Sequence, residues 1–203
     1  MARALSDKPR LLHSAGFGLL GEMLLVGILV AVCLLPAVTA LAGLAAGTRH
    51  LRRHIAGEGD GIRLLLDDLR IAMKGLLLPG VVLVAALLAV AFDVWLLSFV
   101  EAPGEAAVRL VLLAAGLAAV LIAVRLAARW APGMPLRPQL RAAAAVTWRD
   151  PVGTLLLAAA VGAPALFVWM YPPLLVVSGG LVALAGVGVE MRRASRAEPP
   201  AGG

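Results

Sequence analysis

The sequence predicts an all-α fold, a polytopic transmembrane helical bundle that forms a single membrane domain over residues 1–203. Three observations predict it. Of the residues, 62% are hydrophobic, whereas soluble domains are about 45–50% apolar. The apolar residues come in long runs with few charges, which is typical of spanning helices. Because the runs do not alternate apolar with polar residues, as barrel strands do, we expect the spans to be helices.

The first apolar run covers residues 15–47 and is interrupted by Glu22 and Pro36. We expect one long helix here, kinked at Pro36, which gives five spanning helices in total. The alternative is a turn near Pro36 with two short crossings, which gives six. The choice decides the side of the N-terminal residues Arg3, Lys8 and Arg10, because one crossing places them outside the cell and two place them inside.

The later apolar runs predict the remaining spans. The last run, residues 152–189, is too long for one span and is broken at Tyr171-Pro172-Pro173, since a residue before proline disfavours helix. We therefore expect two short helices joined by a tight turn in this region. The predicted spans are residues 76–100, 106–128, 152–171 and 173–190, followed by a disordered tail over residues 194–203.

Two polar stretches between the runs predict amphipathic helices on the membrane surface. In the surface helix at residues 61–74, apolar side chains share one face, and Arg63, Asp67, Arg70 and Lys74 share the other. This charged face is a candidate partner-binding or lipid-binding surface. A shorter helix follows the proline-containing stretch that begins near residue 129, and its Trp148 suits the lipid–water boundary.

The distribution of basic residues predicts the orientation. The net charge is +6, and 14 of the 18 Lys and Arg residues lie in residues 49–74, in residues 125–149 and after residue 190. The opposing turns contain one, Arg109. Cytoplasmic loops carry the excess of Lys and Arg, so the basic loops and the C-terminus are expected in the cytoplasm. With one Tyr and no polar domain that could hold a groove, the positive charge does not indicate nucleic-acid binding.

From Gly16 onward the sequence resembles the YesL family of bacterial integral membrane proteins. The resemblance rests on Leu34-Leu35-Pro36-Ala37-Val38-Thr39, on the basic segment Thr48-Arg49-His50-Leu51-Arg52-Arg53 with Gly57-Glu58 after it, and on Tyr171-Pro172-Pro173 with the following hairpin. It implies a multi-pass protein of the bacterial cytoplasmic membrane. Because members often lie beside genes for carbohydrate uptake, it also implies an accessory role in that process.

Three ionisable residues inside the apolar runs form the candidate intramembrane polar site: Glu22, Asp93 and Arg125. Charges in spans are costly and often functional. With one N-terminal crossing, Glu22 and Asp93 can approach each other and bind a proton or a cation. With two crossings, Glu22 lies nearer the cytoplasm, where Arg125 can pair with it. We find no catalytic set and no cofactor motif, and the arginines around His50 and His54 disfavour a metal.

These observations lead to two expected functions. The first is a non-enzymatic accessory component, possible partners being another membrane protein or a second copy in a homo-oligomer within the lipid bilayer. The second is a small oligomeric transporter or channel that uses the intramembrane carboxylates.

Overall fold

The computed structural model describes residues 8–34, 36–58, 61–99, 103–171 and 175–197. Over these residues the chain forms seven α-helices, one 3-10 turn (Leu97–Phe99) and no strand, which confirms the all-helical prediction. The helices are α1 (Lys8–Leu34), α2 (Ala40–Ile55), α3 (Ile62–Leu96), α4 (Glu105–Arg129), α5 (Leu136–Arg149), α6 (Pro151–Met170) and α7 (Leu175–Ala197).

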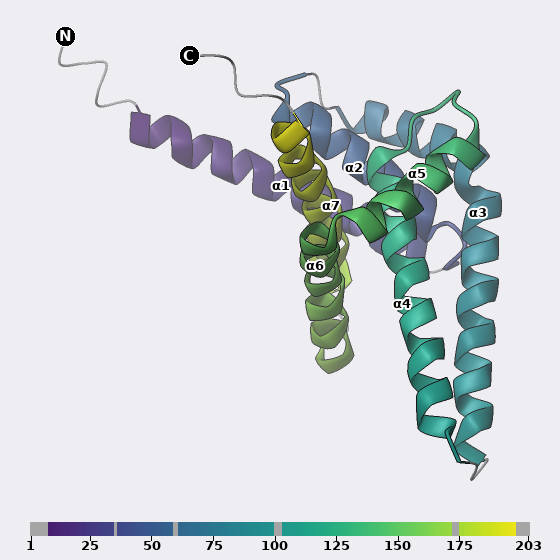
Figure 1. Ribbon diagram of the computed structural model, residues 1–203. Helices are drawn as coiled ribbons and strands as arrows, with labels where there is room; N and C mark the ends of the chain where they lie inside the picture. The colour runs from purple at the N-terminus through teal and green to yellow at the C-terminus, as the bar shows by residue number, and fades with distance from the viewer. Residues whose placement is uncertain (1–7, 35, 59–60, 100–102, 172–174, 198–203) are drawn as a thin grey trace.

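The helices form two hairpins that extend in the same direction from a common head (Figure 1). The longer hairpin is made by α3 and α4, and the shorter one by α6 and α7. Helix α2 lies in the head and packs against α1, α3, α4 and α7. Its side chains from Leu41 to Leu51 are mostly buried, with Leu51 fully inaccessible. The apolar core therefore surrounds α2.

The expectation of one kinked helix over residues 15–47 is wrong, because α1 ends at Leu34 and α2 begins at Ala40. The backbone turns at Pro36 and Ala37, and Ala37 adopts a positive φ of 52° that no helix accommodates. The Thr39 hydroxyl donates a hydrogen bond of 2.5 Å to the Cys33 carbonyl, one of the acceptors left free where α1 ends. Proline removes a helical hydrogen bond at the same place. The chain therefore reverses instead of kinking.

Helices α1 and α2 pack antiparallel and at close range. Gly43 faces Cys33, and Gly47 faces Val26, so closely that a Cβ at either glycine would overlap the facing side chain. Small residues at such contacts let helix backbones approach, as is common between membrane helices. As a consequence, the end of α2 lies beside the middle of α1, and the hairpin returns toward the side from which α1 comes.

The expected surface helix at residues 61–74 is not separate from the next span, because α3 runs unbroken from Ile62 to Leu96. Gly75, Pro79 and Gly80 interrupt the pattern of helix-favouring residues where the two segments meet. Pro79 is accommodated inside the helix, where Gly80 lies against the Val38 carbonyl and the indole of Trp130 covers Gly75. The amphipathic segment is therefore the first part of one long helix.

Three of the other helices agree with the predicted elements to within a few residues. Helices α4 and α6 match the expected segments 106–128 and 152–171, and α5 is the expected second amphipathic helix. Residues 172–174 and 198–203 lie outside the described residues. The expected disordered tail begins too early, because α7 continues to Ala197.

Length and composition identify two candidates for crossing a membrane among the described helices. These are Ile62–Phe99, which includes the 3-10 turn, and Glu105–Arg129. Gly18–Leu34 and Pro151–Ala163 are apolar but shorter.

Candidate functional site: a layer of buried ion pairs

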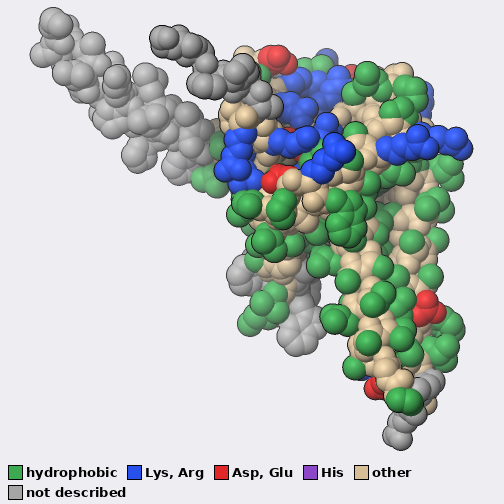
Figure 2. All heavy atoms as spheres, in the orientation of Figure 1, with side chains coloured by type: hydrophobic (Ala, Val, Ile, Leu, Met, Phe, Trp, Pro, Cys, Tyr) green, Lys and Arg blue, Asp and Glu red, His purple; other side chains and the backbone are tan. Residues whose placement is uncertain are grey.

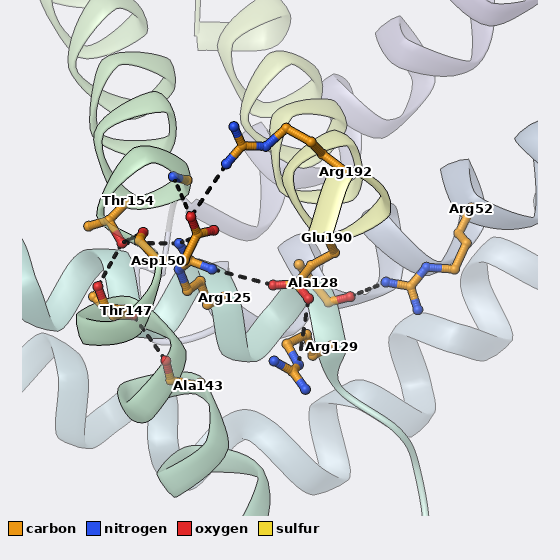
Figure 3. Close-up of polar contacts among 11 residues, drawn as sticks. Arg52, Arg125, Ala128, Arg129, Ala143, Thr147, Asp150, Thr154, Glu190 and Arg192 are labelled. Atoms are coloured by element: carbon orange, nitrogen blue, oxygen red, sulfur yellow. Dashed lines mark hydrogen bonds and ion pairs between the residues drawn. The ribbon is translucent and has the colours of Figure 1, made fainter. Parts of the chain in front are cut away.

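The charged side chains gather in a band across the head of the molecule, whereas the hairpins below are mostly apolar (Figure 2). At the centre of this region lies Arg125, near the end of α4 and only 1% exposed. Its Nη2 donates a hydrogen bond of 3.0 Å to the Thr154 hydroxyl (Figure 3). The guanidinium also forms ion pairs with Asp150 at 3.7 Å and with Glu190 at 3.6 Å.

Asp150 is held in place by the local sequence Asp150-Pro151. Its Oδ1 accepts a hydrogen bond of 2.9 Å from the Gly153 backbone N–H, as an N-cap residue does, and proline is favoured at the first helical position. The carboxylate also lies 3.4 Å from Arg192 Nη2 of α7. The pKa of Asp150 is lowered, first by the Gly153 hydrogen bond and then by Arg125 and Arg192, against an opposing effect of burial.

Glu190 connects α7 to α4 through two arginines. Its second carboxylate oxygen lies 3.7 Å from Arg129 Nε, one helical turn after Arg125. We call Arg125, Arg129, Asp150, Glu190 and Arg192 the ion-pair network. Three positive charges meet two negative ones in it, so most of the buried charge is compensated. The network joins α4, α7 and the start of α6.

A second set of ion pairs joins α2 to α3. Asp68 is 4% exposed and receives Arg53 and Arg49, with Arg49 Nε at 3.5 Å from Oδ1. Between these arginines in the sequence, Arg52 donates a hydrogen bond to the Ala128 carbonyl at the end of α4. The basic end of α2 is thus attached to two neighbouring helices.

The predicted polar site of Glu22, Asp93 and Arg125 is not assembled in the structure. Glu22 of α1 contacts His50, whose fully buried ring has Nε2 2.6 Å from the carboxylate. Arg125 has the partners given above. Asp93 is exposed near the end of α3. Since 25 residues of α3 separate it from Asp68, it lies about 38 Å along the helix from the band of charge.

The predicted charged face of residues 61–74 is present and open. Arg63, Asp67, Arg70 and Lys74 are all exposed and line one side of the first part of α3, with Leu66, Leu69 and Met73 beside them. We call these four charged residues the α3 strip. Unlike the ion-pair network, it lies on the surface of the described chain.

Sequence reasoning missed Asp150 and Glu190 as partners of Arg125. The Asp-Pro dipeptide was the available signal for Asp150, because it is typical of a helix start with the carboxylate turned toward the first backbone N–H groups. No local signal identifies Glu190. It lies 65 residues after Arg125, and only the packing of α7 against α4 brings the two together.

The arrangement supplies guanidinium groups, carboxylates and hydroxyls that bind charges and orient helices. Comparison of the chain with protein-family models, with curated proteins and with solved structures found no significant match.

Proposed function

We propose that the chain is a multi-pass protein of the bacterial cytoplasmic membrane. The observation that carries this proposal is the exposure of large apolar side chains along α3 and α4, including Leu78 (72%), Leu88 (65%) and Leu110 (69%). In water, such a large exposed apolar surface would favour aggregation. Lipid solvates it, and the helices satisfy their own backbone hydrogen bonds.

The proposed orientation places the charged band of the head on the cytoplasmic side. The head contains the basic ends of α2 and α4, and cytoplasmic segments carry the excess of Lys and Arg. The hairpins of α3 and α4 and of α6 and α7 then cross the membrane, which accounts for four of the expected five spans.

The antiparallel packing of α1 on α2 supports a cytoplasmic N-terminus. The apolar part of α2, residues 40–48, is about 14 Å long, roughly half of the hydrocarbon core. Such a segment is too short to cross. In this proposal α1 and α2 enter the membrane and return to the same side without crossing it. The N-terminus is then cytoplasmic, as in the six-helix alternative, but the two helices add no full crossing.

The proposed role is that of a non-enzymatic accessory component, of the type that the YesL resemblance implies, linked to carbohydrate uptake. The accessory role is supported by which charged side chains have internal partners and which are exposed. Arg125 is engaged by internal partners, whereas the α3 strip is exposed and available to a partner protein. The alternative, an oligomeric transporter, would need Glu22 and Asp93 to act together. Their separate positions favour the accessory role.

Cysteine accessibility tests the membrane proposal. Cys33 is the only cysteine, so single cysteines are introduced on a Cys33→Ser background. An impermeant thiol reagent should label Arg109→Cys in intact spheroplasts, and Arg63→Cys only after permeabilisation. A reporter fused to the N-terminus should be active on the cytoplasmic side. Recovery of the chain in the soluble fraction, or labelling of Arg63→Cys in intact cells, would contradict the proposal.

Purification in mild detergent tests the role. We expect carbohydrate permease subunits to co-purify in stoichiometric amounts, and the double variant Arg70→Glu/Lys74→Glu to lose them. Arg137→Glu/Arg141→Glu, which reverses two exposed charges at the same spacing on α5, is the matched control. A pure homo-oligomer that supports solute flux in liposomes would instead favour the transporter.

A further inference from the structure

A pocket of about 450 Å³ opens in the charged band, between the end of α2 and the segment that joins α4 to α5. Three arginines of α2 line it, Arg49, Arg52 and Arg53, together with Trp130 and the last residues of α4. We call this the arginine pocket. It is separate from the α3 strip, whose residues do not line it.

The positive charge of the arginine pocket is only partly compensated. Asp68, which does not line the pocket, engages Arg49 and Arg53, and Glu58 is the carboxylate on the lining. Arg52 has a backbone carbonyl as its partner. Three guanidinium groups therefore face two carboxylates, which leaves an excess of one positive charge.

Two guanidinium N–H groups of the lining arginines are buried without an acceptor among the described residues. They are Nη1 of Arg49 and Nε of Arg53. A buried donor without a partner costs the full desolvation of that group, and more when it is charged, so such donors normally have a protein, water or ion partner. The pocket thus has a net positive charge and room for a ligand, and one of its lining arginines, Arg52, is exposed.

We propose that the arginine pocket binds a phosphate group. Guanidinium groups match phosphate oxygens through paired N–H donors, and several arginines on successive turns favour this ligand over a neutral one. Arg52 is the principal ligand, because it is the exposed arginine of the three and is not engaged by a carboxylate.

The position of the pocket indicates how the phosphate is supplied. If the head faces the cytoplasm, as proposed above, the pocket lies at the depth of the anionic phospholipid headgroups, where basic residues and Trp concentrate. The lipid headgroup and free phosphate share the chemistry that the pocket recognises. The inference that a lipid supplies the phosphate rests on the proposed membrane location, whereas phosphate binding itself does not.

Native mass spectrometry of the detergent-purified full chain tests this proposal with three probes: phosphatidylglycerol, phosphatidylcholine and sodium phosphate. We expect Arg52→Gln to raise the dissociation constant about tenfold for phosphatidylglycerol or for sodium phosphate, the loss of a hydrogen bond to a charged group. Arg52→Lys keeps the charge but not the paired donors and should give an intermediate value. Arg63→Gln, the same charge change on the α3 strip, is the control and should leave the constant unchanged.

The probes separate the sources of the phosphate. Arg52-dependent binding of phosphatidylglycerol assigns the site to a lipid headgroup, and Arg52-dependent binding of sodium phosphate alone assigns it to the free anion. The proposal is overturned if Arg52→Gln and Arg63→Gln bind every probe equally. If Arg52→Gln does not fold, Arg52→Lys makes the same comparison. A chain that proves soluble would refute the membrane proposal while sodium phosphate binding could still succeed.

Discussion

Replacing Arg125 by Met tests whether the ion-pair network holds the bundle together. Met fills the space of the apolar stem but removes the charge, so the main effect is electrostatic. Asp150 then keeps Arg192 and the Gly153 N–H, and Glu190 keeps Arg129. Both carboxylates lose the guanidinium that lies between them. Breaking a buried ion pair costs about 3–5 kcal/mol.

The expected cost lies at the lower end of that range, about 3 kcal/mol, because both carboxylates retain another arginine and are slightly exposed. For a chain of this size, 1 kcal/mol shifts Tm by about 2–4 °C. The expected fall in Tm is therefore about 6–12 °C. In the double variant Arg125→Met/Glu190→Gln, part of this loss should be recovered, since the second change removes a carboxylate that has lost one of its two arginine partners and keeps only Arg129.

The chain contains a convenient reporter for this assay. Cys33 is its only cysteine and is 7% exposed, so a fluorogenic thiol reagent reacts fully only when the helices separate. Heating the detergent-purified protein with the reagent gives Tm. The control is Arg109→Met on the same helix, where a 3.8 Å pair with Glu105 is more than a third exposed and is worth at most about 1 kcal/mol. If both variants melt within 2 °C of each other, roughly the 1 kcal/mol scale, the buried network contributes no special stability.

Three further results are expected. The folded-state pKa of Asp150 lies below its unfolded value of about 3.9, so the stabilisation that the carboxylate gives is complete above the unfolded pKa and is lost as pH falls through the folded pKa. Asp150→Asn should therefore flatten the acidic part of a Tm profile measured at pH 2–6. An unchanged slope would show that Asp150 does not contribute this stability. Gly180→Ala should lower the free energy of unfolding by about 1–3 kcal/mol, because its Cβ would overlap the Met23 carbonyl. Gly188→Ala on the same helix has open space around the new Cβ and serves as the control. Equal melting curves for the two variants would refute the close packing of Gly180. Asp93→Asn should leave Tm and partner co-purification unchanged, since the side chain is exposed far from the charged band, and loss of either would reinstate it as a functional residue.

Much of the secondary structure could be predicted because it depends on local signals. Apolar runs bounded by charges and prolines define α4 and α6, and the amphipathic pattern defines α5 and the first part of α3. The turn at Pro36 was missed because proline is compatible both with a kink and with a reversal. The close contacts of Gly43 and Gly47 with α1 accompany the reversal, and they join two different helices, whereas a periodic pattern relates only residues within one helix.

The candidate site was less predictable. The sequence analysis grouped three ionisable residues, Glu22, Asp93 and Arg125, because each interrupts an apolar run. The position of a charge in such a run does not show which residue pairs with it. His50 of the next helix contacts Glu22, and Asp150 compensates Arg125 from a helix start 25 residues away. The four residues of the α3 strip are exposed on one helix, and helical periodicity alone places them together. Their role as a partner-binding or lipid-binding surface stays a prediction.

The sequence by itself determined the helical class, the apolar segments and the concentration of basic residues near their ends. These follow from residue type and spacing along one helix. Only the tertiary structure decided which charges neutralise one another and which remain exposed. Ion pairs act over a few ångströms, so the packing of α2, α4 and α7 decides which charged residues pair. The spacing of residues along the sequence does not show this packing.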